Sequence, residues 1–280
     1  MTATPTETVD AVVIGGGITG IYQTYLLHRL GLQVRGVEEA PDVGGTWYWN
    51  RYPGCRLDTE SYAYGFFALR GLMPEWQWSE RFAGQPELLR YVRAAADRMD
   101  VRRHYRFGAR VRSAHYDDVA DRWRVTLEDG AVIDCRFLLS AVGPLSATRL
   151  PEIPGMDEFR GESFHSSRWP RGEGAESDGP ARTDFTGRRV GVIGTGATGV
   201  QIIPEVAKTA RTLHVFQRTP NWCTPLGNHA LTPERLAELR GDPQRRSAPS
   251  WGLQWGVRCS RLGGGRCLDR SQPIPFQVPA

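Results

Sequence analysis

The sequence predicts an α/β protein with two Rossmann-like dinucleotide-binding domains, of which the second is incomplete. Two glycine signatures indicate this fold, one at residues 15–20 and one at residues 194–199. Each signature directly follows an apolar segment and precedes a segment with helical periodicity. A glycine-rich turn between a strand and a helix is typical of a βαβ unit that binds a dinucleotide.

The first unit is predicted from three consecutive segments. Residues 9–14 are rich in β-branched side chains, as a strand buried on both faces should be. Residues 18–30 read as a helix, and residues 34–37 as the next strand. The order strand, glycine turn, helix and strand makes the glycine signature far more specific than it would be alone.

Four residues of this unit are candidate ligands of a dinucleotide. Gly15 permits the tight turn, Gly17 lets a pyrophosphate approach the backbone, and Gly20 lets the helix pack closely on the strand. Glu38 lies 18 residues after Gly20, a position that suits hydrogen bonds from a ribose. The alternative is a glycine-rich turn that binds no ligand.

Residues 86–100 are predicted to form a helix that begins at Pro86, a residue favoured in the first turn. A meander should follow, with a turn at residues 128–130 and then a further, separate buried strand. The expected strands are residues 111–116, 123–127, 132–135 and 137–142.

The second unit should consist of a strand, a helix and a strand at residues 188–193, 199–207 and 212–217, with Gly194, Gly196 and Gly199 in its turn. Its second strand ends in Arg218 rather than an acid. An arginine there can pair with a 2′-phosphate, which favours NADPH over NADH. A solvated surface arginine is the alternative.

Composition excludes several classes of function. The net charge is only +4, and the arginines are spread along the chain, so we expect no nucleic-acid partner. The five cysteines include no Cys-x-x-Cys pair, which argues against a disulfide framework and a metal site. No run reaches the roughly 18 apolar residues of a membrane span, and a cytoplasmic location is expected.

Four regions are predicted along the chain. The first domain covers residues 1–150, a linker 151–187 and the partial second domain 188–240. Within the linker, residues 171–186 read as a surface loop. Residues 241–280 show no periodicity and supply no third strand for the second unit.

Two longer motifs carry a family resemblance. The first comprises Gly44, Gly45, Trp47, Tyr52, Pro53, Gly54 and Asp58, and the second Phe159, Gly161, His165, Trp169 and Pro170. With both glycine signatures, the chain resembles the type I Baeyer–Villiger flavin monooxygenases over roughly residues 8–240. The resemblance implies FAD on the first unit and NADPH on the second. It also implies insertion of one oxygen atom of O2 into a small ketone, giving an ester or lactone.

The resemblance further implies roles for single residues. Glu38 would hold the FAD ribose, and Val111 would contact the adenine through its backbone. Asp58 would be the catalytic carboxylate, tuning an arginine that stabilises the flavin peroxide anion, although a turn-capping Asp is the alternative. The residues expected along the flavin are Thr46, Trp47, Asp58 and Tyr64.

His165 invites assignment as a general base, but the resemblance implies that it couples NADPH binding to domain movement.

Relatives are nearly twice as long, and no residue in 241–280 matches their catalytic arginine. We therefore expect a chain truncated by a frameshift or early stop near Arg240, with weak oxygenation and with NADPH oxidation that releases hydrogen peroxide. The alternatives are an N- or S-oxygenating flavin monooxygenase and a non-catalytic nucleotide-binding remnant. A flavin disulfide reductase is rejected because Cys55 has no partner cysteine nearby in sequence.

Overall fold

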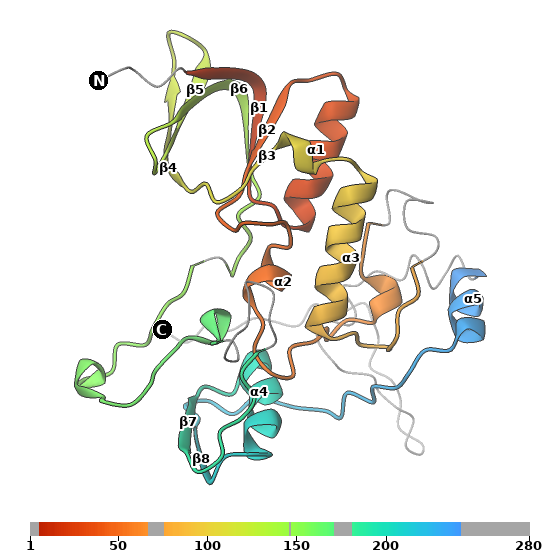
Figure 1. The fold of residues 1–280 in the computed structure, drawn as a ribbon, viewed down its shortest axis with the longest axis vertical. Coiled ribbons are helices and arrows are strands. Elements are labelled where there is room, and N and C mark those ends of the chain that lie inside the picture. Colours follow the sequence, from red (N-terminus) through yellow and green to blue (C-terminus); the bar gives the residue numbers. More distant parts are fainter. Residues whose placement is uncertain (1–5, 67–75, 146, 171–180, 242–280) are drawn as a thin grey trace, which may run out of the picture. The chain divides into compact units, whose positions relative to one another are not determined.

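The computed structural model describes residues 6–66, 76–145, 147–170 and 181–241 (Figure 1). Its first part is built on a six-stranded sheet with the strand order β3-β2-β1-β6-β5-β4. The strands are β1 Glu7–Ile14, β2 Val34–Val37, β3 Tyr105–Arg106, β4 Val111–Asp117, β5 Arg122–Leu127 and β6 Val132–Ser140.

The parallel half of the sheet is the predicted first βαβ unit. Strand β1 pairs in parallel with β2 on one side and with β6 on the other, and helix α1 (Ile18–Arg29) connects β1 to β2. Alternate residues of β1 face opposite sides, because side chains along a strand alternate. Val12 belongs to a cluster with residues of β5 and β6, whereas Ala11 and Val13 pack with Leu27 of α1.

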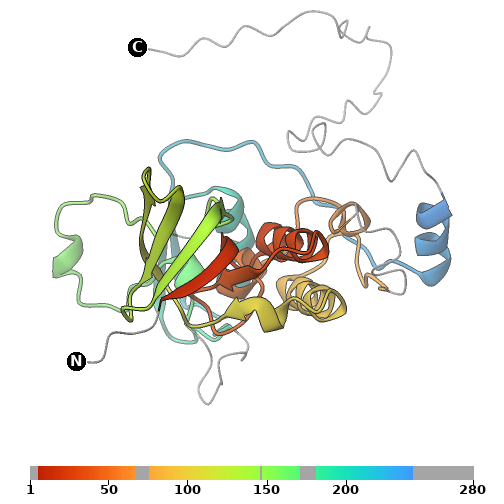
Figure 2. The same ribbon diagram turned by 90° about the horizontal axis from the view of Figure 1, so that it is seen from above.

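Helices α1 and α3 (Gln85–Arg98) lie together on one side of the strands (Figure 2). Pro86 stands in the first turn of α3, as predicted, where its missing N–H leaves no bond unmade. Ile21 of α1 and Val92 of α3 are fully buried in the same cluster. This cluster forms the largest part of the described core.

The antiparallel meander of β4, β5 and β6 confirms the predicted hairpins, but the prediction of two separate strands at residues 132–135 and 137–142 is wrong. A single strand, β6, runs through both, pairing with β5 up to Cys135 and with β1 as far as Ser140. Arg136 suggests a break because it is a charged residue between the two expected strands. In the structure it is an exposed residue within β6, whose side chain points to the face opposite those of its two neighbours. The second half is not buried either, since Phe137 is 47% exposed.

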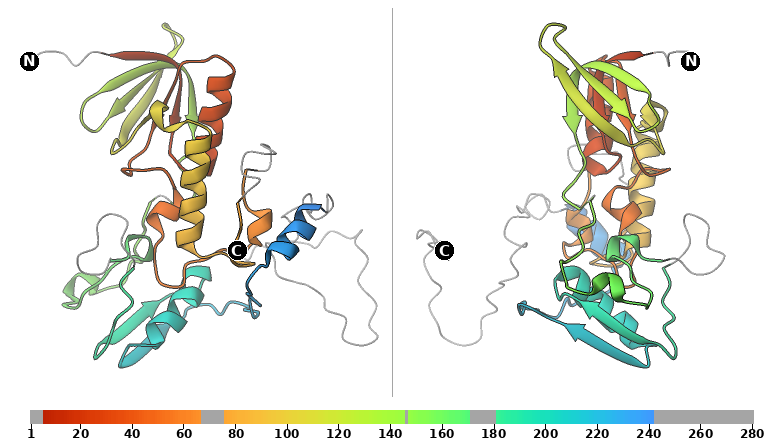
Figure 3. Two further views of the ribbon diagram at one scale, coloured as in Figure 1. Left: turned by 45° about the vertical axis from the view of Figure 1, so that its right-hand side comes forward. Right: turned by 90° about the vertical axis from the view of Figure 1, so that its left-hand side faces the viewer.

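The second predicted unit consists of β7 (Arg189–Ile193), α4 (Ala197–Ala207) and β8 (Thr212–Phe216). The two strands pair in parallel and α4 packs on both (Figure 3). Ile202 and Val206 of α4 are buried, so the helix contributes its apolar face to the core. The fold class predicted from the sequence is confirmed, including the two-stranded extent of this unit in the described residues.

Several shorter elements were not predicted. Helix α5 begins after Thr232, whose hydroxyl accepts from the N–H of Arg235 at 3.3 Å, and Pro233 opens its first turn. The others are α2 (Thr46–Trp49) and the 3₁₀ turns η1 (Ser61–Ala63), η2 (Arg102–His104), η3 (Met156–Glu158) and η4 (Ser166–Arg168); α5 spans Pro233–Gly241. The predicted loop at 171–186 and tail at 241–280 lie largely outside the described residues. None of the described helices has the length and apolar character needed to span a bilayer.

Substitution of Gly20 by alanine tests the close packing of α1 on the first glycine turn. A Cβ atom at this position would lie 1.8 Å from the carbonyl oxygen of Gly15. We expect Gly20→Ala to lower the free energy of unfolding by about 3 kcal/mol, measured by denaturant titration.

The matched control is Gly191→Ala, because a Cβ there meets nothing closer than 3.4 Å. It should leave the unfolding free energy unchanged or raise it by about 0.5 kcal/mol. Equal stability of the two variants would contradict the packing described.

Candidate nucleotide-binding sites

The first glycine turn lies where the carboxyl ends of β1, β2 and β6 meet. The N–H of Gly15 donates to the carbonyl of Val37 at 2.8 Å, and the N–H of Ala141 donates to that of Ile14 at 2.8 Å. Gly15 has a φ of +108°, and a Cβ there would lie 2.5 Å from the carbonyl oxygen of Ala141. Only glycine fits this turn, and ligands of such sheets bind at this edge.

A second glycine pair closes the other side of this turn. The N–H of Gly44 donates to the carbonyl of Gly16 at 3.0 Å. Gly45 has a φ of +53°, and a Cβ on it would lie 2.7 Å from the Cα of Gly17, the N-cap residue of α1. The backbone that would face a pyrophosphate is therefore fixed from two sides.

Glu38 stands at the end of β2, beside the glycine turn. It is only 6% exposed, and its carboxylate accepts from the N–H groups of Gly16 and Ala40, the latter at 2.7 Å. Burial raises the pKa of Glu38 above its usual range, although the two N–H groups oppose that shift. A buried acid with two acceptor oxygens at this position fits a site that receives ribose hydroxyls.

Val111 is held near this acid by the backbone. The N–H of Glu38 donates to the carbonyl of Arg106 at 3.0 Å, and the N–H of Ala109 donates to the carbonyl of Glu38 at 2.9 Å. Val111 begins β4 two residues later and is half-buried. The structure thus brings Val111 to the strand end that also carries Glu38.

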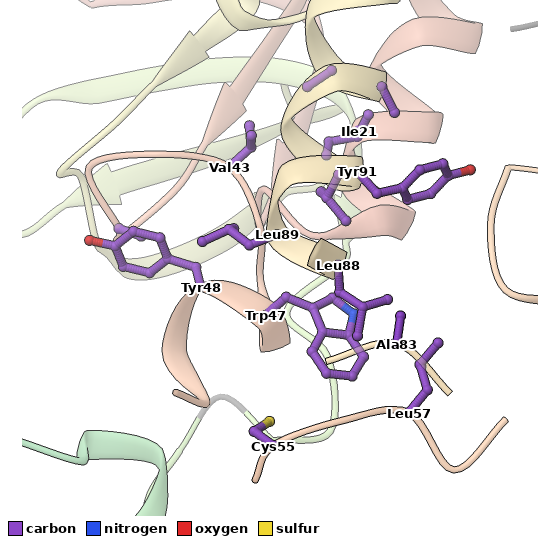
Figure 4. Close-up of a cluster of buried hydrophobic side chains, with 14 of the residues drawn as sticks. Ile21, Val43, Trp47, Tyr48, Cys55, Leu57, Ala83, Leu88, Leu89 and Tyr91 are labelled. Atoms are coloured by element: carbon purple, nitrogen blue, oxygen red, sulfur yellow. The ribbon is translucent and has the colours of Figure 1, made fainter. Parts of the chain in front are cut away.

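The segment after Gly45 places the aromatic candidates. Trp47 is 8% exposed, and its indole N–H donates to the hydroxyl of Tyr64 at 2.7 Å. The two rings meet edge to face at 5.9 Å, and burial raises the pKa of Tyr64. Trp47 also belongs to the buried cluster that includes Leu88 (Figure 4). Thr46 begins α2, so the structure brings Thr46, Trp47 and Tyr64 together.

Asp58 differs from these residues because it is exposed. It follows the buried Leu57, and its carboxylate accepts no hydrogen bond from the described part of the chain. The turn-capping alternative therefore gains no support, since a cap would accept a backbone N–H.

The second glycine turn repeats the construction of the first. Gly194 has a φ of +100°, and its N–H donates to the carbonyl of Phe216 at 2.9 Å. A Cβ on Gly199 would lie 2.3 Å from the carbonyl oxygen of Gly194, whereas one on Gly196 would meet nothing within 4 Å. The space over Gly196, at the start of α4, fits a group that approaches the helix N-terminus.

Arg218 is exposed just beyond β8. Its neighbour Gln217 donates to the hydroxyl of Thr195 at 2.8 Å, and the Asn221 side chain donates to the carbonyl of Thr195. The segment that carries Arg218 is thereby tied to the second glycine turn. The structure brings the cation and the turn into one region.

The linker motif is anchored by its aromatic and basic residues. The indole N–H of Trp169 donates to the carbonyl of Arg182 at 2.9 Å, and the Arg168 guanidinium lies 4.1 Å from the ring centroid of Trp49. His165 accepts from the N–H of Ser167 at 3.2 Å and so caps a 3₁₀ turn. Sequence reasoning missed the Arg168–Trp49 contact between the two motifs.

No cluster of His, Cys, Asp or Glu suited to a metal ion occurs in the described ranges. Cys55 and Cys135 are buried free thiols, and burial raises the pKa of both, that of Cys55 to about 12. Such thiols are unreactive near neutral pH.

Two glycine turns, each following the first strand of a parallel βαβ unit, define a protein of the double dinucleotide-binding class. A family model agrees: the flavin-binding monooxygenase-like model matches residues 9–227. The chain belongs to this family.

The chain is 65% identical over 233 residues to the 2-oxo-Δ3-4,5,5-trimethylcyclopentenylacetyl-CoA monooxygenase of Pseudomonas putida, covering 83% of this chain and 42% of the relative. It is 41% identical over 234 residues to a Baeyer–Villiger monooxygenase of Pseudooceanicola batsensis, covering 83% and 41%. A solved structure of OTEMO in complex with FAD and NADP is similar with a TM-score of 0.79 and 64% identity, covering 83% and 43%. The resemblance predicted from the motifs is confirmed, and the chain spans about two fifths of these relatives.

The pH dependence of stability tests the environment of Glu38. Because the pKa of Glu38 is raised from 4.5 in the folded state, its stabilising contribution is present below that value and is lost as the pH rises through the folded-state pKa. Relative to Glu38→Gln, the wild type should therefore lose unfolding free energy as the pH rises from about 4 to about 8. Denaturant titrations across that range measure it. A difference that stays constant, or that grows in favour of the wild type, would show that the carboxyl is not desolvated.

Proposed function

We propose that this chain supplies the FAD site and the beginning of the NADPH site of a monooxygenase that inserts one atom of O2 into a small ketone, giving an ester or lactone. The observation that carries the proposal is the contrast between the two glycine turns. One is bonded to the buried acid Glu38, and the other is tied to the segment that carries the exposed cation Arg218. An acid suits an unmodified ribose and an arginine suits a 2′-phosphate, so the two units would take different dinucleotides.

FAD fits the first unit, where Gly15, Gly17 and Gly20 would hold the pyrophosphate and Glu38 the ribose. Val111 would meet the adenine through its backbone, while Thr46, Trp47 and Tyr64 would flank the flavin. When bound, FAD supplies the redox and oxygen chemistry, while the protein binds and orients it. The buried Trp47 indole, bonded to Tyr64, excludes water from its surroundings.

Asp58 is our candidate for the catalytic carboxylate. It is exposed and accepts no hydrogen bond from the described residues, so its charge can pair with a cation that lies outside them. A carboxylate beside an arginine fixes that cation in place and holds its charge toward the reacting oxygen.

NADPH fits the second unit, with Gly194, Gly196 and Gly199 around the pyrophosphate and Arg218 at the 2′-phosphate. His165, which caps its own 3₁₀ turn, is proposed as a linker residue that couples NADPH binding to domain movement. We propose that the first domain covers residues 1–150, the linker 151–187 and the partial second domain 188–240.

We also propose a cytoplasmic location, where buried free thiols such as Cys55 stay reduced. Small molecules, a ketone and O2, are the proposed partners, with neither nucleic acid nor membrane.

An oxygenation assay tests the proposal. The chain, loaded with FAD, is given NADPH, isotopically labelled O2 and a cyclic ketone, and the products are analysed by mass spectrometry. We expect FAD-dependent oxidation of NADPH that releases mainly hydrogen peroxide, with only a small yield of lactone that carries one labelled atom. FAD-loaded chain that oxidises no NADPH would contradict the proposal. Labelled N-oxides or sulfoxides from amine or sulfide substrates, with no lactone, would favour the N- or S-oxygenating alternative.

Substitution of Arg218 tests the assignment of NADPH. A charge-assisted contact to a phosphate contributes about 1.5–3 kcal/mol. Arg218→Ala should therefore weaken NADP+ binding about 10- to 100-fold and leave NAD+ binding unchanged, as measured by calorimetry.

Arg211→Ala is the matched control, because Arg211 is exposed just before β8 begins, at the opposite end of that strand. It should leave both affinities unchanged. An equal loss of NAD+ and NADP+ affinity in Arg218→Ala would remove the 2′-phosphate role.

A further inference from the structure

Residues 52–56, in the first motif, lie against helix α4 of the second unit. The hydroxyl of Tyr52 donates to the Oε1 atom of Gln201 at 3.0 Å. Tyr52 is 9% exposed, and burial raises its pKa, so the hydroxyl keeps the proton it donates. A side chain from the first unit is thus fixed to the N-terminal half of α4.

The Gln201 amide makes two more bonds to the same segment. Its Oε1 accepts from the N–H of Arg56 at 3.3 Å, and its Nε2 donates to the carbonyl of Arg56 at 3.2 Å. The side chain therefore satisfies both backbone polar groups of Arg56, as a neighbouring strand would. Arg56 is in turn bridged to Glu80 at 3.0 Å.

Gly54 lets the two parts come this close. It has a φ of +78°, and a Cβ there would lie 2.6 Å from the carbonyl oxygen of Gln201 and 3.0 Å from the Cγ of Glu205. Backbone meets backbone at this point, so any larger residue would push α4 away. The glycine of the Tyr-Pro-Gly run is explained by this contact.

Both ends of the contact reach a candidate site. Thr198 belongs to the second glycine turn, and Gln201 follows that turn by two residues. On the other side, Arg56 stands two residues before Asp58, and Tyr52 follows α2, which carries Trp47. A shift of the N-terminal half of α4 would therefore move the segment that holds Asp58, because Gln201 is bonded to that segment.

We propose that Tyr52 and Gln201 are positioning residues, and that their contact couples nucleotide binding at the second glycine turn to the placement of the Trp47–Asp58 segment beside the first. This inference rests on the proposed function. A nucleotide that orders the first two turns of α4 orders Gln201 with them, and so favours one arrangement of Arg56. Because coupling between sites is reciprocal, FAD should tighten NADP+ binding as much as NADP+ tightens FAD binding.

Calorimetry measures the coupling as the ratio of NADP+ dissociation constants without and with saturating FAD. In the wild type we expect a ratio of at least about 5. In Gln201→Leu, which keeps the volume but not the hydrogen bonds, the ratio should fall to within about twofold of 1, while NADP+ binding without FAD is unchanged. A purely structural role for Gln201 would instead weaken NADP+ binding in both conditions.

Gln33→Leu is the matched control, since Gln33 is exposed and lies before β2, outside this contact. It should keep the wild-type ratio. A wild-type ratio near 1, or an unchanged ratio in Gln201→Leu, would overturn the inference while leaving the two nucleotide sites intact. A wild type that binds neither nucleotide would instead overturn the proposed function.

The contact itself is tested without nucleotide by a double-mutant cycle of Tyr52→Phe and Gln201→Leu. We expect the two variants to shift the denaturant midpoint non-additively, because both remove the same hydrogen bond. Additive shifts would overturn the inference independently of any nucleotide binding.

Discussion

Close backbone approach at the carboxyl ends of the strands is the constraint on which the rest of this structure depends. Gly15 turns against the carbonyl of Ala141, and Gly20 of α1 packs on the carbonyl of Gly15. Neither position has room for a Cβ atom. The turn, the start of α1 and the end of β6 are thereby fixed together, and the N–H groups at the start of α1 face one shared edge.

The position of the Gly44–Asp58 segment depends on that edge, and the segment in turn contacts the linker and the second unit. Gly45 rests on Gly17, which fixes where α2 and its aromatic side chains begin. Farther along, Gly54 rests on α4, and Arg168 of the linker motif lies over Trp49. Both family motifs thus act as contact surfaces, which joins the linker and the second unit to the segment that carries the candidate flavin neighbours.

Much of the fold could be predicted because local signals agreed with it. Strands β1 and β7 are apolar and are followed by glycines with positive φ, so their βαβ units were found from pattern alone. Strand β6 was divided wrongly, because an outward Arg136 looks like a break when the pairing partners are unknown. Helix α2 has only four residues and shows no helical period, so no local pattern could reveal it.

The candidate site was predictable only in part. Gly15, Gly20 and Glu38 followed from spacing within a known unit, whereas the exposure of Asp58 did not. The bond between Tyr52 and Gln201 joins residues 149 positions apart, and no sequence period indicates such a pair. Contacts of this kind depend on the path of the linker, which brings the second unit back against the first. Short-range sequence patterns do not encode that path.

The measurement that tests the central claim most directly is the visible absorption spectrum of the purified chain after incubation with FAD and removal of unbound FAD, expressed as flavin per protein. We expect about one flavin per chain, because hydrogen bonds within the chain itself hold the first glycine turn and Glu38 in place. A chain that is folded by circular dichroism and retains no flavin would contradict it.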